Sequence, residues 1–200
     1  MHYRTNEKLE AINSLEFVSE QVEKVSEDIS KWKWIIIGLH NALQNYMVCA
    51  LRRLENTNVL THKSARDVLT EFFNIMDLPE NKWKFPKEKL DSFTNLFEKI
   101  QSDKMKKNVN SKVFKPTHSQ IDCVINLNLF RNEFIHFVPK SWSLGVNGLS
   151  NLVVEVLTII EFLAFESHNI VWSEESEKSR TLNAISNIKN KFNEQIQNAT

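Results

Sequence analysis

Glycine and proline are scarce in this chain, with three glycines and four prolines among 200 residues. β-Sandwiches and β-barrels need many tight turns, and glycine and proline are the residues that favour such turns. Seven of these residues are too few for a fold of that kind. Apolar residues recur instead at spacings of three and four over long stretches, as they do along one face of an α-helix. The sequence therefore predicts an all-α protein.

An excess of charge of one sign is also absent, because 25 basic residues balance 25 acidic ones. A chain without net charge has no strong field to steer a polyanion, which argues against a general nucleic-acid coat but not against a local site. One local imbalance exists: five lysines and no acidic residue occur between Lys104 and Lys115, at positions 104, 106, 107, 112 and 115. We interpret this segment first as a solvated loop; the alternative is an arm that contacts a polyanion backbone.

Long apolar runs are missing as well. The most apolar stretch, 149–165, is interrupted by Glu155 and Glu161, so a buried helix explains it better than a membrane span. The N-terminal residues lead directly into a polar helical pattern, and no secretory signal is visible. We therefore expect a cytoplasmic protein without a membrane partner.

Only two cysteines occur, Cys49 and Cys123, each among apolar neighbours. In the absence of a secretory signal they are expected to be reduced, buried thiols. Neither has a second cysteine or a histidine at metal-ligand spacing, and no glycine-rich phosphate loop is found. The sequence thus predicts neither a metal nor a cofactor.

The helical pattern extends along the chain without a repeat or a dividing linker, so residues 1–200 are expected to form a single domain. Start and stop signals include Pro79, Pro86 and Pro139, together with a capping box made by Thr117 and Gln120. Trp32 and Trp34 are expected to lie against another helix or a second subunit, as packing residues more than as platforms for stacked bases. The predicted helices cover approximately residues 6–27, 30–54, 64–77, 86–100, 117–137, 149–168 and 173–197.

Two groups of polar residues fall within apolar helical stretches. His40 and Gln44 share a helix face; they could support a catalytic cleft or line a subunit interface, and a hydrogen-bonded core pair is the interpretation that we favour. Arg131, Asn132 and His136 lie near the end of a later helix, where leaving them buried without partners would be costly. One interpretation of the second group is structural: Arg131 pairs with an acidic neighbour and His136 sits at the helix C-terminus, where positive charge is favoured.

The second interpretation of that group is functional. An arginine, a polar residue, a short spacer and a histidine at the end of a late helix resemble the motif of the HEPN superfamily, and the segment 34–44 is similar to the long first core helix of such proteins. The resemblance covers a core of about 30–168. It implies a single-domain antiparallel helical bundle with additional flanking helices, which forms a homodimer that brings two motifs together. It also implies metal-independent cleavage of RNA, as in toxins with an antitoxin partner, antiphage effectors or RNA-processing factors.

The same resemblance implies catalytic roles for Arg131, Asn132 and His136. Histidine can transfer protons near neutral pH, and arginine offers a permanent charge and a fork of donors for phosphate oxygens. Asn132 would orient the histidine or the substrate. Because some members of the superfamily have lost catalysis, the alternative is a non-catalytic HEPN-like binding or regulatory module. A helical scaffold unrelated to RNA is the third interpretation.

Overall fold

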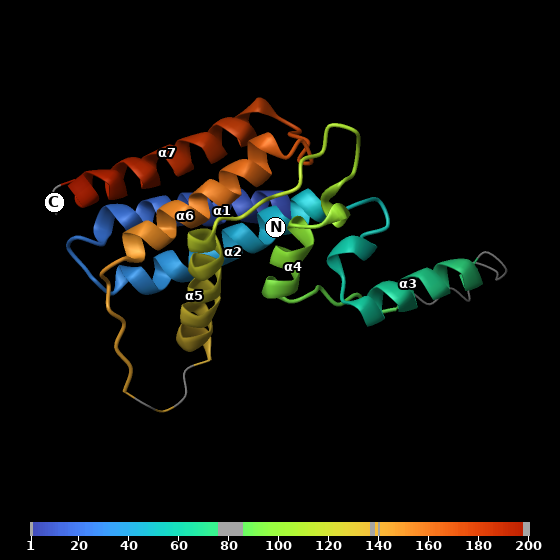
Figure 1. Cartoon of the computed structure of the whole chain (residues 1–200), viewed down its shortest axis with the longest axis horizontal. Coiled ribbons are helices and arrows are strands. Elements are labelled where there is room, and N and C mark those ends of the chain that lie inside the picture. Colours follow the sequence, from blue (N-terminus) through green and yellow to red (C-terminus); the bar gives the residue numbers. More distant parts are fainter. Residues whose placement is uncertain (1, 76–85, 137–138, 140, 198–200) are drawn as a thin grey trace.

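The computed structural model describes residues 2–75, 86–136, 139 and 141–197, and within them an isolated bridge between Leu60 and Leu90 is the only β-type pairing (Figure 1). The all-α prediction is confirmed. Short 3₁₀ turns occur at Thr57–Val59 and Asp103–Met105, and a π-helical turn at Phe162–Glu166. The α-helices are α1 (Glu7–Lys24), α2 (Lys31–Leu51), α3 (His62–Ile75), α4 (Phe93–Ile100), α5 (His118–Ile135), α6 (Leu149–Glu161) and α7 (Glu175–Gln197).

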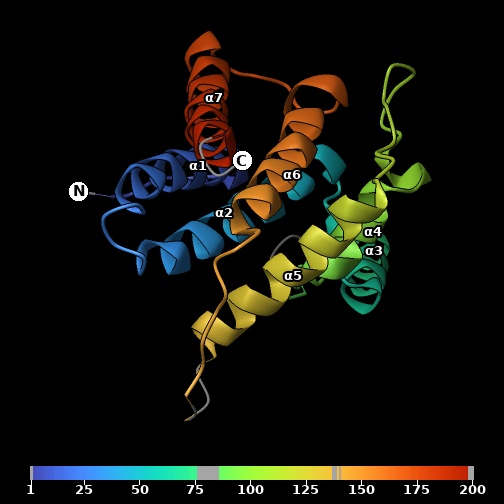
Figure 2. The same cartoon turned by 60° about the vertical axis from the view of Figure 1, so that its left-hand side comes forward.

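Helix α2 is the centre of the molecule. It is apolar around most of its circumference, and more than half of its residues are buried, as expected of a helix surrounded by others. Helix α1 packs antiparallel along it, α7 covers α1, and α6 lies beside α7 and α2 (Figures 1 and 2). Helices α4 and α5 also contact α2. At the start of α2, Trp32 stacks on Phe192 of α7 with ring centroids 5.4 Å apart, which confirms its expected packing role.

The end of α2 lies earlier than its sequence pattern predicts. The helix ends at Leu51, because Arg52 leaves the helical conformation at ψ 131°. Leu54, which the periodicity places on the core face, is fully exposed. The expected extension to residue 54 is therefore wrong: the apolar spacing continues, but the backbone that would bury it does not.

Helix α4 starts later than Pro86 suggested. The segment before it is extended and pairs with the chain around Leu60: the Thr61 amide donates to the Lys89 carbonyl at 3.0 Å, and the Asp91 amide to the Val59 carbonyl at 2.9 Å. Ser92 then caps the helix by accepting from the Asn95 amide. The prediction of a helix from Pro86 is wrong, because long-range backbone pairing replaces the first turns.

Other boundaries agree with the sequence more closely. The Thr117–Gln120 capping box at the start of α5 is confirmed, with both reciprocal hydrogen bonds present. The expected stop of the third helix before Pro79 lies outside the described residues. The predicted helix 149–168 forms as α6 followed by the π-helical turn, in which the Ser167 amide donates to the Phe162 carbonyl at 2.8 Å.

Candidate functional site

The C-terminal end of α5 carries the motif, and it extends beyond the α1–α2 pair (Figures 1 and 2). Arg131 and Asn132 are both half-buried there, and a guanidinium N–H of Arg131 donates to the Asn132 side-chain oxygen at 3.0 Å. Among the described residues Arg131 forms no ion pair with a carboxylate. The guanidinium is thus oriented by an amide while its charge remains available to an anion.

Arg131 lines a groove of about 410 Å³ between α1, α2 and the end of α5. Helix α1 contributes polar side chains and Phe17, and α2 contributes Trp34, Gly38 and Gln44. Ile135, one turn after Arg131, completes the wall on the side of α5. Asn132 and His136 are not among the described residues that line this groove.

His40 lies on the inner side of the groove and is almost completely buried. Its Nε2–H donates to the side-chain oxygen of Asn128 on α5 at 3.1 Å, and its ring stacks on Phe93 with centroids 3.9 Å apart. Burial lowers the pKa of His40 to about 4; the hydrogen bond to Asn128 acts in the opposite direction, and the charge of Arg131 lowers the pKa further. His40 is therefore neutral at pH 7. The expected pairing with Gln44 is wrong, because a residue 88 positions away takes its place.

His136 occupies a different environment from His40. It is the C-cap of α5, its backbone amide donates to the Asn132 carbonyl at 2.8 Å, and its side chain is exposed. No hydrogen bond or ion pair connects its imidazole to the rest of the described chain. Within one chain the structure thus brings Arg131 and Asn132 together and leaves the His136 ring free at the helix end.

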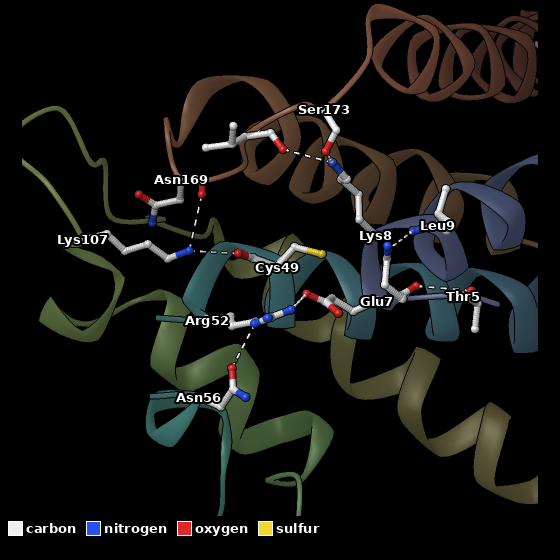
Figure 3. Close-up of polar contacts among 12 residues, drawn as sticks. Thr5, Glu7, Lys8, Leu9, Cys49, Arg52, Asn56, Lys107, Asn169 and Ser173 are labelled. Carbon is white, nitrogen blue, oxygen red and sulfur yellow. Dashed lines mark hydrogen bonds and ion pairs between the residues drawn. The ribbon is translucent and has the colours of Figure 1, made fainter. Parts of the chain in front are cut away.

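The lysine-rich segment 104–115 is only partly a solvated loop. Lys107 turns inward, where its ammonium donates to the carbonyl oxygens of Cys49 at 2.9 Å and Asn169 at 3.4 Å (Figure 3). Burial lowers the pKa of Lys107 to about 8. Lys106 is exposed and pairs with Asp103 at 2.8 Å. At least Lys107 therefore serves to close the C-terminal end of α2 and is not free to contact a polyanion.

The described residues show neither an activated thiol nor a metal site. Cys49 and Cys123 are free thiols, and burial raises the pKa of Cys49 to about 12. Within the described ranges, no group of three or more His, Cys, Asp or Glu side chains is placed to hold a metal ion. Nor is any helix of this part of the chain both long and apolar enough to cross a bilayer.

The sequence singled out Arg131, His40 and Gln44, but it did not predict the two aromatic side chains that line the groove with them. Phe17 lies outside the apolar stripe of α1, and Trp34 was expected to pack, yet their exposed fractions are 38% and 43%. Gly38 was the one available signal. A glycine inside a helix marks a close approach of another segment, here α1: a Cβ at Gly38 would lie 2.7 Å from a methyl group of Val18.

Comparison with protein-family models, curated proteins and solved structures found no match to this chain. The likeness to the HEPN superfamily therefore rests on the residues of the motif and their context.

Proposed function

We propose that this protein is a metal-independent endoribonuclease of the HEPN type. The observation that carries the proposal is the state of Arg131, which is oriented by Asn132, borders an open groove and is not neutralised by a described carboxylate. A guanidinium in this state suits the binding of a phosphate oxygen. The interpretation in which Arg131 forms a structural ion pair has no support among the described residues.

The chemistry requires few protein groups. The 2′-oxygen of a ribose attacks the adjacent phosphorus while the bond from phosphorus to the 5′-oxygen breaks, which leaves a 2′,3′-cyclic phosphate and a free 5′-hydroxyl. His136 transfers a proton, either from the 2′-hydroxyl or to the leaving 5′-oxygen. Arg131 stabilises the charge on the phosphate, and Asn132 holds the guanidinium in place. The nucleophile belongs to the substrate, so a metal is not needed to generate it.

A second copy of the chain would supply the second proton-transfer group. Asn132 and His136 continue a line of α5 residues spaced by three and four, whose earlier members are Ile125 and Leu129. These two apolar side chains are 49% and 53% exposed. If two α5 helices pack through this stripe, their two His136 side chains lie at the same interface. We therefore propose that the complete site forms in a homodimer.

An RNA-cleavage assay with EDTA tests the proposal. The wild-type protein is compared with Arg131→Ala and His136→Ala, and the ends of the products are identified. We expect cleavage that leaves 2′,3′-cyclic phosphates and falls by at least about 100-fold in both variants, because each removes a group that acts in the transition state.

The matched controls are Arg66→Ala and His62→Ala, which remove exposed side chains of the same types from α3, a helix that does not carry the motif. Both should cleave like the wild type. Equal activity in all five proteins would reject the site. A folded, dimeric wild type that cleaves no RNA would favour the non-catalytic module. Expression in a host cell gives an independent readout: a toxin should slow growth, and His136→Ala should relieve the effect.

A further inference from the structure

The groove beside Arg131 contains two aromatic side chains that the core covers only in part. Phe17 of α1 and Trp34 of α2 both line it while remaining about two-fifths exposed. Large aromatic residues usually bury most of their surface, because each contributes much apolar area. Two such residues in one groove provide flat apolar surfaces that are accessible from solvent.

The close packing of α1 on α2 creates this arrangement. At Gly38 the two helices approach so closely that an added Cβ would lie 3.2 Å from the Phe17 ring and 2.7 Å from Val18. Without a side chain at position 38, the Phe17 ring lies over the backbone of α2. One turn further along the antiparallel pair, the Asn41 amide donates to the Ser14 hydroxyl at 2.7 Å. The floor of the groove is therefore fixed by backbone and short side chains.

Some polar side chains of the groove already have hydrogen-bond partners within the chain, and one does not. Glu10 accepts hydrogen bonds from Tyr3 and Thr5, and Asn41 is held by Ser14. The half-buried amide of Gln44 has no hydrogen-bond partner among the described residues. A side-chain amide with both a donor and an acceptor can bind the edge of a nucleobase.

The charges of the groove suit one phosphodiester. Arg131 is the lining cation, at the wall formed by α5, and Glu10 is the lining carboxylate. Lys33 does not line the groove; its ammonium lies over one face of the Trp34 ring, 5.1 Å from the centroid, so a base would stack on the other face. A nucleoside triphosphate carries several negative charges and would also face Glu10, whereas a single phosphodiester carries one. A wholly apolar ligand would leave Arg131 and Gln44 without partners, which is unfavourable.

We infer that this groove binds single-stranded RNA, with one unstacked base against Trp34 and Phe17 and a phosphate at Arg131. Gln44 lies ten residues after Trp34 on α2, about 15 Å along the helix, and so would contact the base of a neighbouring nucleotide. Proteins recognise single-stranded RNA in this way, because every base has a face that can stack on an aromatic side chain. The inference rests on the proposed nuclease function. It specifies the site that binds the RNA next to the cleaved bond.

The test measures binding apart from cleavage. A fluorescein-labelled octamer of uridine is titrated in EDTA with the His136→Ala protein, so that no substrate is consumed, and with the same protein carrying Trp34→Ala or Phe17→Ala. We expect the dissociation constant to rise about tenfold for either substitution, as one lost stacking contact predicts. Trp34→Phe should restore most of the affinity. Phe72→Ala removes an exposed aromatic side chain of α3 and should leave the affinity unchanged.

A second measurement does not depend on variants. An octamer containing 5-iodouridine is irradiated with the protein, and the crosslinked peptides are identified; crosslinks to Phe17 or Trp34 support the inference. Equal affinity in all variants, or crosslinks confined to other segments, would overturn it. If the protein binds free AMP or UMP but not the octamer, the groove is not an RNA site. If the aromatic variants change the oligomeric state but not the affinity for RNA, the inference is also overturned.

The outcomes also separate the two proposals. Binding that depends on Trp34, from a wild type that cleaves no RNA, supports this inference and rejects the nuclease. Cleavage by the wild type, with the affinity of Trp34→Ala unchanged, supports the nuclease and rejects this inference.

Discussion

Two histidines of this chain illustrate how much a residue's role depends on its surroundings. His136 is exposed at the end of α5, whereas His40 is buried against Phe93 and bonded to Asn128. Burial, aided by the charge of Arg131, holds the pKa of His40 at about 4, so this side chain is neutral at physiological pH. A neutral His40 helps to position α5 against α2, and it adds no second positive charge beside Arg131.

The low pKa of His40 makes stability depend on pH. Between about pH 6.5 and pH 4 the unfolded chain binds a proton at this residue and the folded chain does not, so stability falls as the pH is lowered through this range. Between pH 7 and pH 5 this residue lowers the free energy of unfolding by about 2 kcal/mol. In urea unfolding, the free energy of unfolding of His40→Gln should therefore fall by about 2 kcal/mol less than that of the wild type between pH 7 and pH 5. The glutamine amide can still donate to Asn128.

His62→Gln is the matched control, because His62 is exposed at the start of α3. Its loss of stability between pH 7 and pH 5 should equal that of the wild type. A His40→Gln variant with the wild-type pH dependence would show that His40 is not the group that titrates.

At the scale of helices, α1 and α2 pack so closely at Gly38 that a larger side chain would not fit there without movement. Val18 is completely buried, and its side chain has a single strongly preferred rotamer in a helix. It cannot easily move away from a new methyl group at position 38. The two helices would have to separate, and with them the rings of Phe17 and Trp34.

We expect Gly38→Ala to destabilise the protein by about 1–3 kcal/mol, as overpacking of a filled core does. The sign is informative, because alanine in place of glycine would otherwise favour the helix by up to about 1 kcal/mol. Thermal or urea unfolding measures the change. Gly145→Ala is the control: no atom lies within 4 Å of the added methyl group, so stability should remain within about 0.5 kcal/mol of the wild type. A neutral Gly38→Ala would mean that the helices are less closely packed.

At the scale of the whole molecule, the exposed stripe of α5 raises the question of what covers it. Ile125 and Leu129 share this face with Asn132 and His136. The C-terminal end of α5 extends beyond the α1–α2 pair (Figure 2). Because these apolar side chains make few contacts within the chain, replacing one should change association more than folding.

Leu129→Lys should therefore convert a dimer into a monomer, since a buried lysine without a partner is costly at a symmetric interface. Multi-angle light scattering or sedimentation gives the mass, and RNA cleavage should fall together with the loss of the dimer. Leu182→Lys introduces the same charge at an exposed position on α7 and should leave the mass unchanged. A wild-type monomer at micromolar concentration would reject the composite site.

The sequence by itself determined the features that depend on neighbouring residues. Scarce glycine and proline and the three-and-four spacing specify helices, and Thr117 with Gln120 specifies where α5 begins. Each of these features needs only a few consecutive residues. The bond from Arg131 to Asn132 was not predicted, although it joins adjacent residues: the resemblance implied that Asn132 orients the histidine or the substrate, and in the structure it holds the guanidinium.

Only the tertiary structure decided the features that join distant segments. The pairing of Asp91 with Val59 delays the start of α4, and the bond from His40 to Asn128 replaces the expected one to Gln44. The groove beside Arg131 exists because three helices meet there. Periodicity shows which face of a helix is apolar, but the partner of that face, and the side chains left uncovered beside it, depend on how the helices pack.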